Sequence, residues 1–276
     1  MASMLPTVSE GFTNESLKGN YAVTCIGQGG QAESATVGVY TFDGSGNMSG
    51  STITNLPGSA FGERVLAQAS LTGSYNVDAD GSGYGSSAML IALPSGLTRE
   101  ISTVLLITRA EVVNNLKIAQ EICLMENNPD PVTGSLNMIF ATRHPDEGEF
   151  SLASFQGTYG GPGIGRGNQV PAAAIGVGAV NFDGNGRFTA VDIQNLPAAL
   201  FGERRTATFD TPGGRYLVNK DGTGTIIGEN GQAALVITRA RVVSDVRIAQ
   251  EYFFVTNDLL PPTGNLVTTL VTKRLF

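Results

Sequence analysis

The chain alternates short runs of β-branched and aromatic residues with turn signals. Runs rich in Val, Ile, Thr, Tyr and Phe are separated by pairs such as Asp43-Gly44 and Asp80-Gly81, which tolerate the positive backbone φ of hairpin turns. In the first half this pattern predicts about eight strands. We expect them at residues 19–25, 35–42, 47–54, 64–70, 73–77 continuing across the second Asp-Gly turn to 86–91, 103–112, 117–124 and 136–142.

The second half of the chain repeats the first. Three pairs of stretches align: SLKGNY (16–21) with SFQGTY (154–159), YTFDGSGNMSG (40–50) with VNFDGNGRFTA (180–190), and ITRAEVVNNLKIAQE (107–121) with ITRARVVSDVRIAQE (237–251). Such a long period indicates a duplicated domain, because solenoid repeats run only ~20–50 residues. We expect an N-terminal tail at 1–15, one β domain at 16–147 and a second at 148–276, with the polar stretch 145–149 as the linker.

Sequential antiparallel strands with short turns close best as an up-and-down barrel, since closure removes exposed strand edges. The predicted fold is therefore all-β, with two tandem antiparallel up-and-down eight-stranded barrels. An open sandwich is the alternative. In the second copy, residues 160–163 read GGPG where the first copy has AVTC, which should weaken or bend the first strand there.

The pattern LKGNY, a Gly-rich gap, YTFDGSGN, GSYNVDADGSG and GSLNMIFATR resembles the small calycin-type or allene-oxide-cyclase-like barrels, here present twice in tandem. The resemblance covers nearly the whole chain, but its motifs are turn and strand-start signals and describe architecture rather than activity. It implies a barrel whose interior holds one apolar small molecule. The group includes carriers, cofactor-free cyclases and the barrel Diels–Alderases of natural-product pathways.

The amino-acid composition and charge exclude some classes of binding partner. Hydrophobic residues make up 41% of the chain and charged residues 15%, which suits a folded protein with real cores. A net charge of -7 without a basic stripe argues against nucleic-acid binding. No apolar run approaches the ~20 residues of a membrane span, and the N-terminus shows no signal peptide. We expect a cytoplasmic protein, with secretion as the alternative, and a homodimer as a possible assembly.

Metal and cofactor chemistry has little support. Cys25 and Cys123 have no counterparts in the second copy, where Gly163 and Phe253 stand, so we interpret both as free core thiols. His144 is the single histidine, which leaves no zinc site and no histidine-based triad. The Asp-Gly loops lack the closing Glu of a calcium loop and are explained as turns. We expect no cofactor.

One hairpin supplies the first candidate residues. If Val113 pairs with Lys117 across a three-residue loop, Arg109 faces Glu121 on the charged outer side and Gln120 falls on the apolar inner side. A buried amide needs partners, either from nearby backbone and hydroxyl groups or from a ligand carbonyl. The candidate ligand-binding residues of this kind, each with core packing as its alternative role, are Gln120, Gln250, Tyr21 and Tyr159.

A loop that is well conserved between the two copies supplies the remaining candidate residues. NLPGSAFGER (55–64) returns as NLPAALFGER (195–204), where the proline ends one strand and the arginine begins the next. This places an aromatic residue and an arginine at one rim of each barrel, either as a packed plug or as a lid over an apolar ligand. The residues concerned are Phe61, Arg64, Phe201 and Arg204.

Three functions fit these features. The first is a cofactor-independent cyclase or isomerase of Diels–Alderase type, which needs mainly a dry, shaped cavity and one or two hydrogen-bond donors. The second is a non-catalytic, lipocalin-like carrier of a hydrophobic ligand. The third is an interaction module that uses two barrels for avidity. The unequal copies further suggest that one barrel binds and the other supports, or that the site lies between them.

Overall fold

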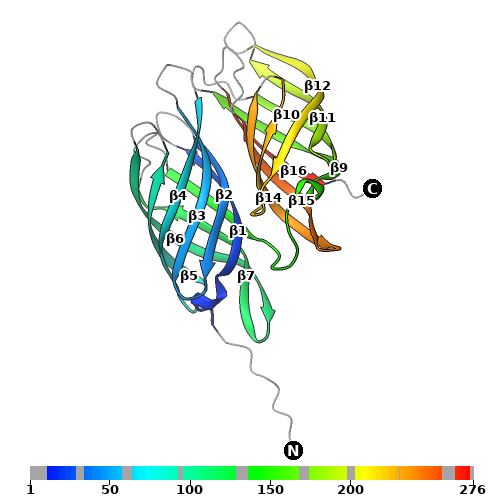
Figure 1. Ribbon diagram of the computed structural model, residues 1–276. Coiled ribbons are helices and arrows are strands. Elements are labelled where there is room, and N and C mark those ends of the chain that lie inside the picture. The colour runs from blue at the N-terminus through cyan, green and yellow to red at the C-terminus, as the bar shows by residue number, and fades with distance from the viewer. Residues whose placement is uncertain are drawn as a thin grey trace, which may run out of the picture.

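The protein forms two β-barrels that lie side by side in a computed structural model (Figure 1). The structure describes residues 11–28, 34–57, 64–92, 96–128, 136–167, 174–197, 203–229, 231–256 and 265–273. In both barrels each strand pairs antiparallel with its neighbours, and the last strand closes on the first. The predicted architecture of tandem up-and-down eight-stranded barrels is confirmed.

Each barrel is preceded by one short 3-10 turn. The first barrel contains η1(Asn14–Ser16), β1(Lys18–Gln28), β2(Ser34–Asp43), β3(Asn47–Pro57), β4(Arg64–Val77), β5(Ser82–Ile91), β6(Leu97–Val113), β7(Leu116–Glu126) and β8(Leu136–Arg143). The second contains η2(Leu152–Ser154), β9(Gln156–Gly167), β10(Ala174–Asp183), β11(Arg187–Pro197), β12(Arg204–Val218), β13(Thr223–Ile227), β14(Gln232–Val243), β15(Val246–Thr256) and β16(Asn265–Lys273). Within the described ranges, no helix has the length and apolarity to cross a membrane.

One local prediction of a glycine-containing strand is wrong, and a second agrees with the strand pairing. Residues 73–77 continue β4 instead of joining 86–91, because a side chain at Gly73 would lie 2.2 Å from the Ser86 carbonyl oxygen. That glycine allows the close approach of β5 and does not mark a turn. The Gly-rich β9 pairs continuously with β10 from Gln156 to Gly165, but its pairing with β16 is interrupted between Gly160 and Gly163, which agrees with the predicted weakening of this strand.

The β6–β7 hairpin has a shorter loop than predicted. Val113 pairs with Leu116, and the two loop residues Asn114 and Asn115 have φ of 50° and 64°. Positive φ at both central residues is typical of the tight turn that matches strand twist. Irregular pairing between Ile107 and Ala110 then restores the predicted match of Arg109 with Glu121, whose side chains lie 3.2 Å apart.

That irregularity explains why each copy keeps a tyrosine at its first strand. Gln120 is left without a partner in the β6–β7 ladder, since Ala110 pairs with Ala119. The buried Tyr21 hydroxyl donates to the Ala119 carbonyl at 2.8 Å. In the second barrel, Tyr159 donates to the Ala249 carbonyl at 3.1 Å. The repeated tyrosine therefore satisfies a backbone carbonyl beside the bulge.

A second pair of tyrosines closes one end of each barrel. The Tyr75 hydroxyl donates to the carbonyl of Leu17 at 2.8 Å, directly after η1. Tyr216 makes the equivalent bond to the carbonyl of Phe155 at 3.3 Å, and it also lies 2.9 Å from the carbonyl of Leu152 in η2. These hydroxyls tie each 3-10 turn across the barrel end, so the opposite end is the one from which a ligand could enter.

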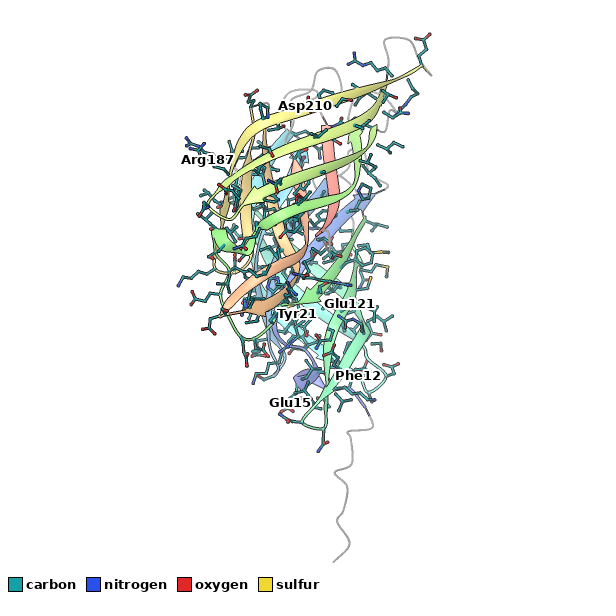
Figure 2. All side chains as sticks on the ribbon, turned by 90° about the vertical axis from the view of Figure 1, so that its right-hand side faces the viewer. Phe12, Glu15, Tyr21, Glu121, Arg187 and Asp210 are labelled. Atoms are coloured by element: carbon teal, nitrogen blue, oxygen red, sulfur yellow. The ribbon has the colours of Figure 1, made fainter. Side chains whose placement is uncertain are left out.

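The two barrels meet through outward-facing side chains. Ala22, Ala35, Val37 and Val39 of β1 and β2 form one buried cluster with four residues of the second barrel, namely Ala234, Val236, Phe253 and Val255 of β14 and β15. Polar contacts flank this cluster. Arg239 lies 2.7 Å from Glu121, which Figure 2 labels near the middle of the molecule, where the barrels meet.

The residues on either side of the predicted linker pack against the second barrel. Phe150 belongs to that barrel's core cluster, and the Arg247 guanidinium lies over its ring at 4.9 Å. Nε2 of His144 lies 2.7 Å from the Ile237 carbonyl and therefore carries the ring proton. Nδ1 is buried without a hydrogen-bond partner in the described part of the chain. Burial lowers the pKa of His144 to about 4.

Replacing Tyr21 by Phe should destabilise the first barrel. The substitution leaves the Ala119 carbonyl unsatisfied in the core, which costs ~1–3 kcal/mol. Urea denaturation measures the loss, and Tyr84→Phe is the matched control because Tyr84 is 64% exposed. Equal free energies of unfolding for Tyr21→Phe and Tyr84→Phe would contradict this role for the hydroxyl.

Stability should fall as the pH is lowered from 6.5 towards 4. The unfolded chain takes up a proton on His144 near its ordinary pKa of 6.5, whereas the folded chain resists until about 4. The free energy of unfolding loses up to ~3 kcal/mol over this window, since each pKa unit is worth ~1.4 kcal/mol. His144→Gln should lack this component. The signal of the single imidazole in proton NMR tests the cause directly, because a native-state titration near 6.5 would refute it.

Candidate functional site: a cavity inside the second barrel

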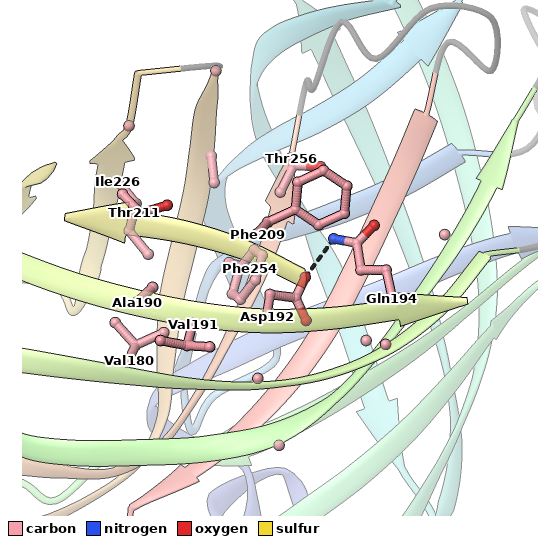
Figure 3. Close-up of a pocket in the computed structure, with 18 of the residues that line it drawn as sticks. Val180, Ala190, Val191, Asp192, Gln194, Phe209, Thr211, Ile226, Phe254 and Thr256 are labelled. Atoms are coloured by element: carbon pink, nitrogen blue, oxygen red, sulfur yellow. Dashed lines mark hydrogen bonds between the residues drawn. The ribbon is translucent and has the colours of Figure 1, made fainter. Parts of the chain in front are cut away.

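The candidate site is a cavity of about 230 Å³ inside the second barrel (Figure 3). Its walls come from the inward-facing residues of β9–β15. Glycines line one side: Gly161, Gly163, Gly165, Gly176 and Gly178. Apolar side chains line much of the rest, among them Val180, Phe188, Ala190, Phe209, Ile226 and Phe254.

At several matching inward positions the second copy carries smaller side chains than the first, although Phe209 and Tyr252 replace the smaller Ala69 and Ile122. Val23 and Cys25 of the first core correspond to Gly161 and Gly163. Tyr40 corresponds to Val180, Leu71 to Thr211, and Ile101 to Gly231, each a loss of side-chain volume. The first barrel is therefore filled by its own residues, whereas the second keeps an open interior.

A buried ion pair completes the filling of the first barrel. The Arg99 guanidinium lies 2.6 Å from the Glu126 carboxylate, with both side chains almost fully buried. Asn137 donates a further hydrogen bond to Glu126 at 2.8 Å. The position of Glu126 is taken in the second copy by Thr256, which lines the cavity instead.

Aromatic side chains form the floor of the cavity. Phe155 and Phe182 are buried, and their ring centroids are 4.7 Å apart. Tyr252 packs edge-on against Phe155 at 5.0 Å and reaches the cavity from that layer. The end tied by η2 is thus closed by tilted and edge-on aromatic rings, and the open volume lies above them.

The polar groups of the wall are few. Asp192 and Gln194 project from alternate positions of β11 towards the cavity, and the Gln194 amide donates to the Asp192 carboxylate (Figure 3). Burial raises the pKa of Asp192, although the bond from Gln194 opposes this shift. In the first copy the matching residues are Thr52 and Thr54. The carboxyl is therefore specific to the hollow barrel.

Two hydroxyls in the wall have no partner in the described part of the chain. These are the phenol of Tyr252, which is fully buried, and Oγ1 of Thr256. A buried polar group without a partner costs ~1–3 kcal/mol. Both residues line the cavity, but their hydroxyl oxygens are themselves buried, so a polar atom of a ligand would reach them only after a small side-chain movement. Burial raises the pKa of Tyr252, which keeps its phenol protonated and able to donate.

The structure does not gather the residues predicted from sequence at this cavity. The six described candidates are absent from its lining: Tyr21, Arg64, Gln120, Tyr159, Arg204 and Gln250. Phe61 and Phe201 lie outside the described residues. The Gln120 and Gln250 amides lie 3.5 and 3.3 Å from the carbonyls of Ile118 and Ile248, two residues earlier in their own strands.

The repeated NLP…ER loop has a structural explanation in its described part. Nε of Arg64 donates to the Asn55 side chain at 2.6 Å, and Arg204 makes the same 2.6 Å bond to Asn195. Asn55 in turn donates to the carbonyl of Thr256 across the two barrels. The pair therefore orders the strand ends on either side of the loop, and a lid function stays a prediction.

Sequence reasoning missed Asp192 and Gln194, although a signal was present. Both follow Phe188 and Ala190 at every second position of one strand, so they share its inward face. A comparison of the copies at these positions would have shown an acid and an amide replacing two threonines.

Comparisons with known proteins do not identify the chain. No family model matches it, and no curated protein does. Among solved structures it is similar to the Aeromonas veronii immune modulator A, with 9% identity over 98% of this chain and 95% of that one, and a TM-score of 0.27. It is also similar to a protein of unknown function from the DUF3598 family of Nostoc punctiforme, with 11% identity over 98% and 100% of the two chains and a TM-score of 0.32.

Proposed function

We propose that the protein binds one small, largely apolar molecule inside its second barrel and acts as a carrier or sensor of that molecule. The observation that carries the proposal is the cavity itself. Matching inward residues are smaller in the second copy than in the first at several independent positions, including Gly161, Gly163, Val180 and Thr211. A hollow interior forfeits packing, so its presence beside the packed core that the described residues of the first barrel form favours a function for the space.

The volume limits the size of the ligand. A cavity of ~150 Å³ holds benzene, and drug-sized ligands occupy pockets of at least ~300 Å³. The 230 Å³ of the second barrel falls between these values. The expected ligand is larger than a single aromatic ring and smaller than most drugs.

The wall chemistry limits the polarity of the ligand. None of the described lining residues is Lys, Arg or His, and the acids are Asp192 and Glu229. An anionic ligand would meet negative charge without compensation. The largely apolar wall instead suits a neutral molecule, and a hydroxyl or carbonyl group on it could pair with Tyr252 or Thr256 after a small side-chain movement.

Binding can be tested with 2-naphthol, a fluorescent bicyclic molecule with one hydroxyl. The chain contains no Trp, so naphthol emission can be followed without tryptophan background. We expect saturable binding at one site per chain. Naphthalene should bind ~2–10-fold more weakly, because it lacks the hydroxyl and a hydrogen bond contributes ~0.5–1.5 kcal/mol.

A variant taken from the first copy locates the site. Thr211→Leu introduces the residue that fills the equivalent position as Leu71, and it should weaken naphthol binding at least ~10-fold by occupying the cavity. Thr206→Leu is the control, because Thr206 is exposed on the same strand. Equal binding by Thr211→Leu and the wild type would refute the cavity as the site, and absence of saturable binding would refute the proposal.

Catalysis of a cofactor-independent isomerisation or cyclisation is the second candidate, and Asp192 is the observation that favours it. A carboxyl in a largely apolar cavity with a raised pKa is suited to proton transfer. The protonated Tyr252 phenol could stabilise negative charge that develops on a ligand oxygen. A carrier needs neither group.

Proton abstraction can be tested with 5-nitrobenzisoxazole. A base removes the proton from its ring carbon while the N–O bond breaks, giving a cyanophenolate and the protonated base. If Asp192 is such a base, the rate should rise with pH through an apparent pKa above that of an ordinary aspartate. Asp192→Asn should abolish this rate yet retain naphthol binding. A rate unchanged in Asp192→Asn would exclude the carboxyl as a base and leave the binding proposal intact.

A further inference from the structure

The contact between the two barrels joins two different faces. The first barrel contributes the outer side of β1 and β2, which we call face 1 (Ala22, Ala35, Val37 and Val39). The second barrel contributes the outer side of β14 and β15, which we call face 2 (Ala234, Val236, Phe253 and Val255). Because the barrels are repeats, the second barrel also has a version of face 1, and the first barrel also has a version of face 2. Neither of these two faces takes part in the contact within the chain.

The unused face 1 of the second barrel is apolar and exposed. Ile175, Val177 and Ala179 stand where the first barrel has Ala35, Val37 and Val39. Ile175 and Val177 are 56% and 59% exposed, whereas their first-barrel counterparts are 0% and 1% exposed. Cross-strand neighbours extend the same surface, with Ile164 beside Ile175 and Ile193 beside Val177.

The unused face 2 of the first barrel has the same character. Leu106 and Met125 stand where the second barrel has Val236 and Val255. They are 50% and 49% exposed, whereas both counterparts are fully buried. Met138 and Phe140 of β8 adjoin them, since Met138 pairs with Met125 and Phe140 with Cys123. Contiguous exposed apolar surface of this kind marks an interaction site.

We propose that these two faces bind each other between copies of the chain, so that face 1 of one second barrel docks on face 2 of the next first barrel. A second copy of this chain is the expected partner, because the same positions of the repeat already form the interface between the two barrels within each chain. Such an interface is heterologous, since it joins different surfaces of the two partners. It builds a closed ring or a growing head-to-tail chain.

The polar contacts of the existing interface can also be repeated. Within the chain, Glu121 of the first barrel binds Arg239 of the second. Their repeat counterparts are Glu251 and Arg109, and both lie at the bulges flanking the unused faces. Asn195, held by Arg204 as Asn55 is by Arg64, would take the place of Asn55. The repeated NLP, ITRA and IAQE stretches thus supply both interfaces.

Sedimentation velocity over a wide range of protein concentration tests the proposal. The wild-type chain should associate reversibly into integer multiples of its mass. Val177→Arg blocks face 1 of the second barrel and Leu106→Arg blocks face 2 of the first, so each variant alone should remain monomeric. Leu217→Arg is the matched control, because Leu217 is 58% exposed and belongs to neither face. Thermal melts confirm that each exposed substitution leaves the fold intact.

Mixing the two variants distinguishes this arrangement from a symmetric dimer. Val177→Arg keeps an intact face 2, and Leu106→Arg keeps an intact face 1. An equimolar mixture should form 1:1 complexes and nothing larger. The proposal is overturned if the wild type stays monomeric at all concentrations, if either variant still associates alone, or if the mixture gives no complex.

Discussion

Closure of an eight-stranded barrel is the constraint on which the rest of this structure depends. Once the strands close, the interior has a fixed width that side chains either fill or leave open for one small ligand. Both copies close in the same strand order, so their backbones offer similar space. The difference between a solid and a hollow barrel therefore lies in a few inward positions, such as Tyr40 against Val180 and Cys25 against Gly163.

Alternation along the strands lets the two sides of one sheet evolve separately. Gly176 and Gly178 line the cavity, while Val177 between them is exposed on the outside. A replacement at an inward position such as Gly178 can therefore leave the exposed apolar surface of the same strand unchanged, and the converse also holds. The inward replacements that open the second barrel and the outward apolar residues that cover β9–β11 are consequently independent features of the same three strands.

The architecture could be predicted from sequence because its signals are local. Asp43-Gly44 and Asp183-Gly184 mark turns by backbone conformation alone, and both carboxylates accept backbone hydrogen bonds from the residues that follow. The strand order then follows from short connections. The pairing register of the strands was harder to predict. Val113 pairs with Leu116 rather than with Lys117, and a bulge further along the strand restores the expected pairing of Arg109 with Glu121. Such compensation needs the coordinates of both strands.

The site could not be predicted in the same way, because a cavity is a property of many positions together. Tyr159 and Gln250 attracted interest as polar residues, yet the tyrosine bonds a backbone carbonyl and the amide lies beside carbonyls of its own strand. Asp192 became visible only when the barrel wall assembled around it. Polar residues that serve the backbone and those that serve a ligand look alike in sequence.

The hollow interior also gives the two halves of the molecule different mechanical properties. An internal void is volume that unfolding removes, and hydrostatic pressure favours whichever state occupies less volume. The packed first barrel offers little such volume, whereas the second offers its cavity. Pressure should therefore favour unfolding of the second barrel more than of the first, and a molecule seated in the cavity would reduce that difference.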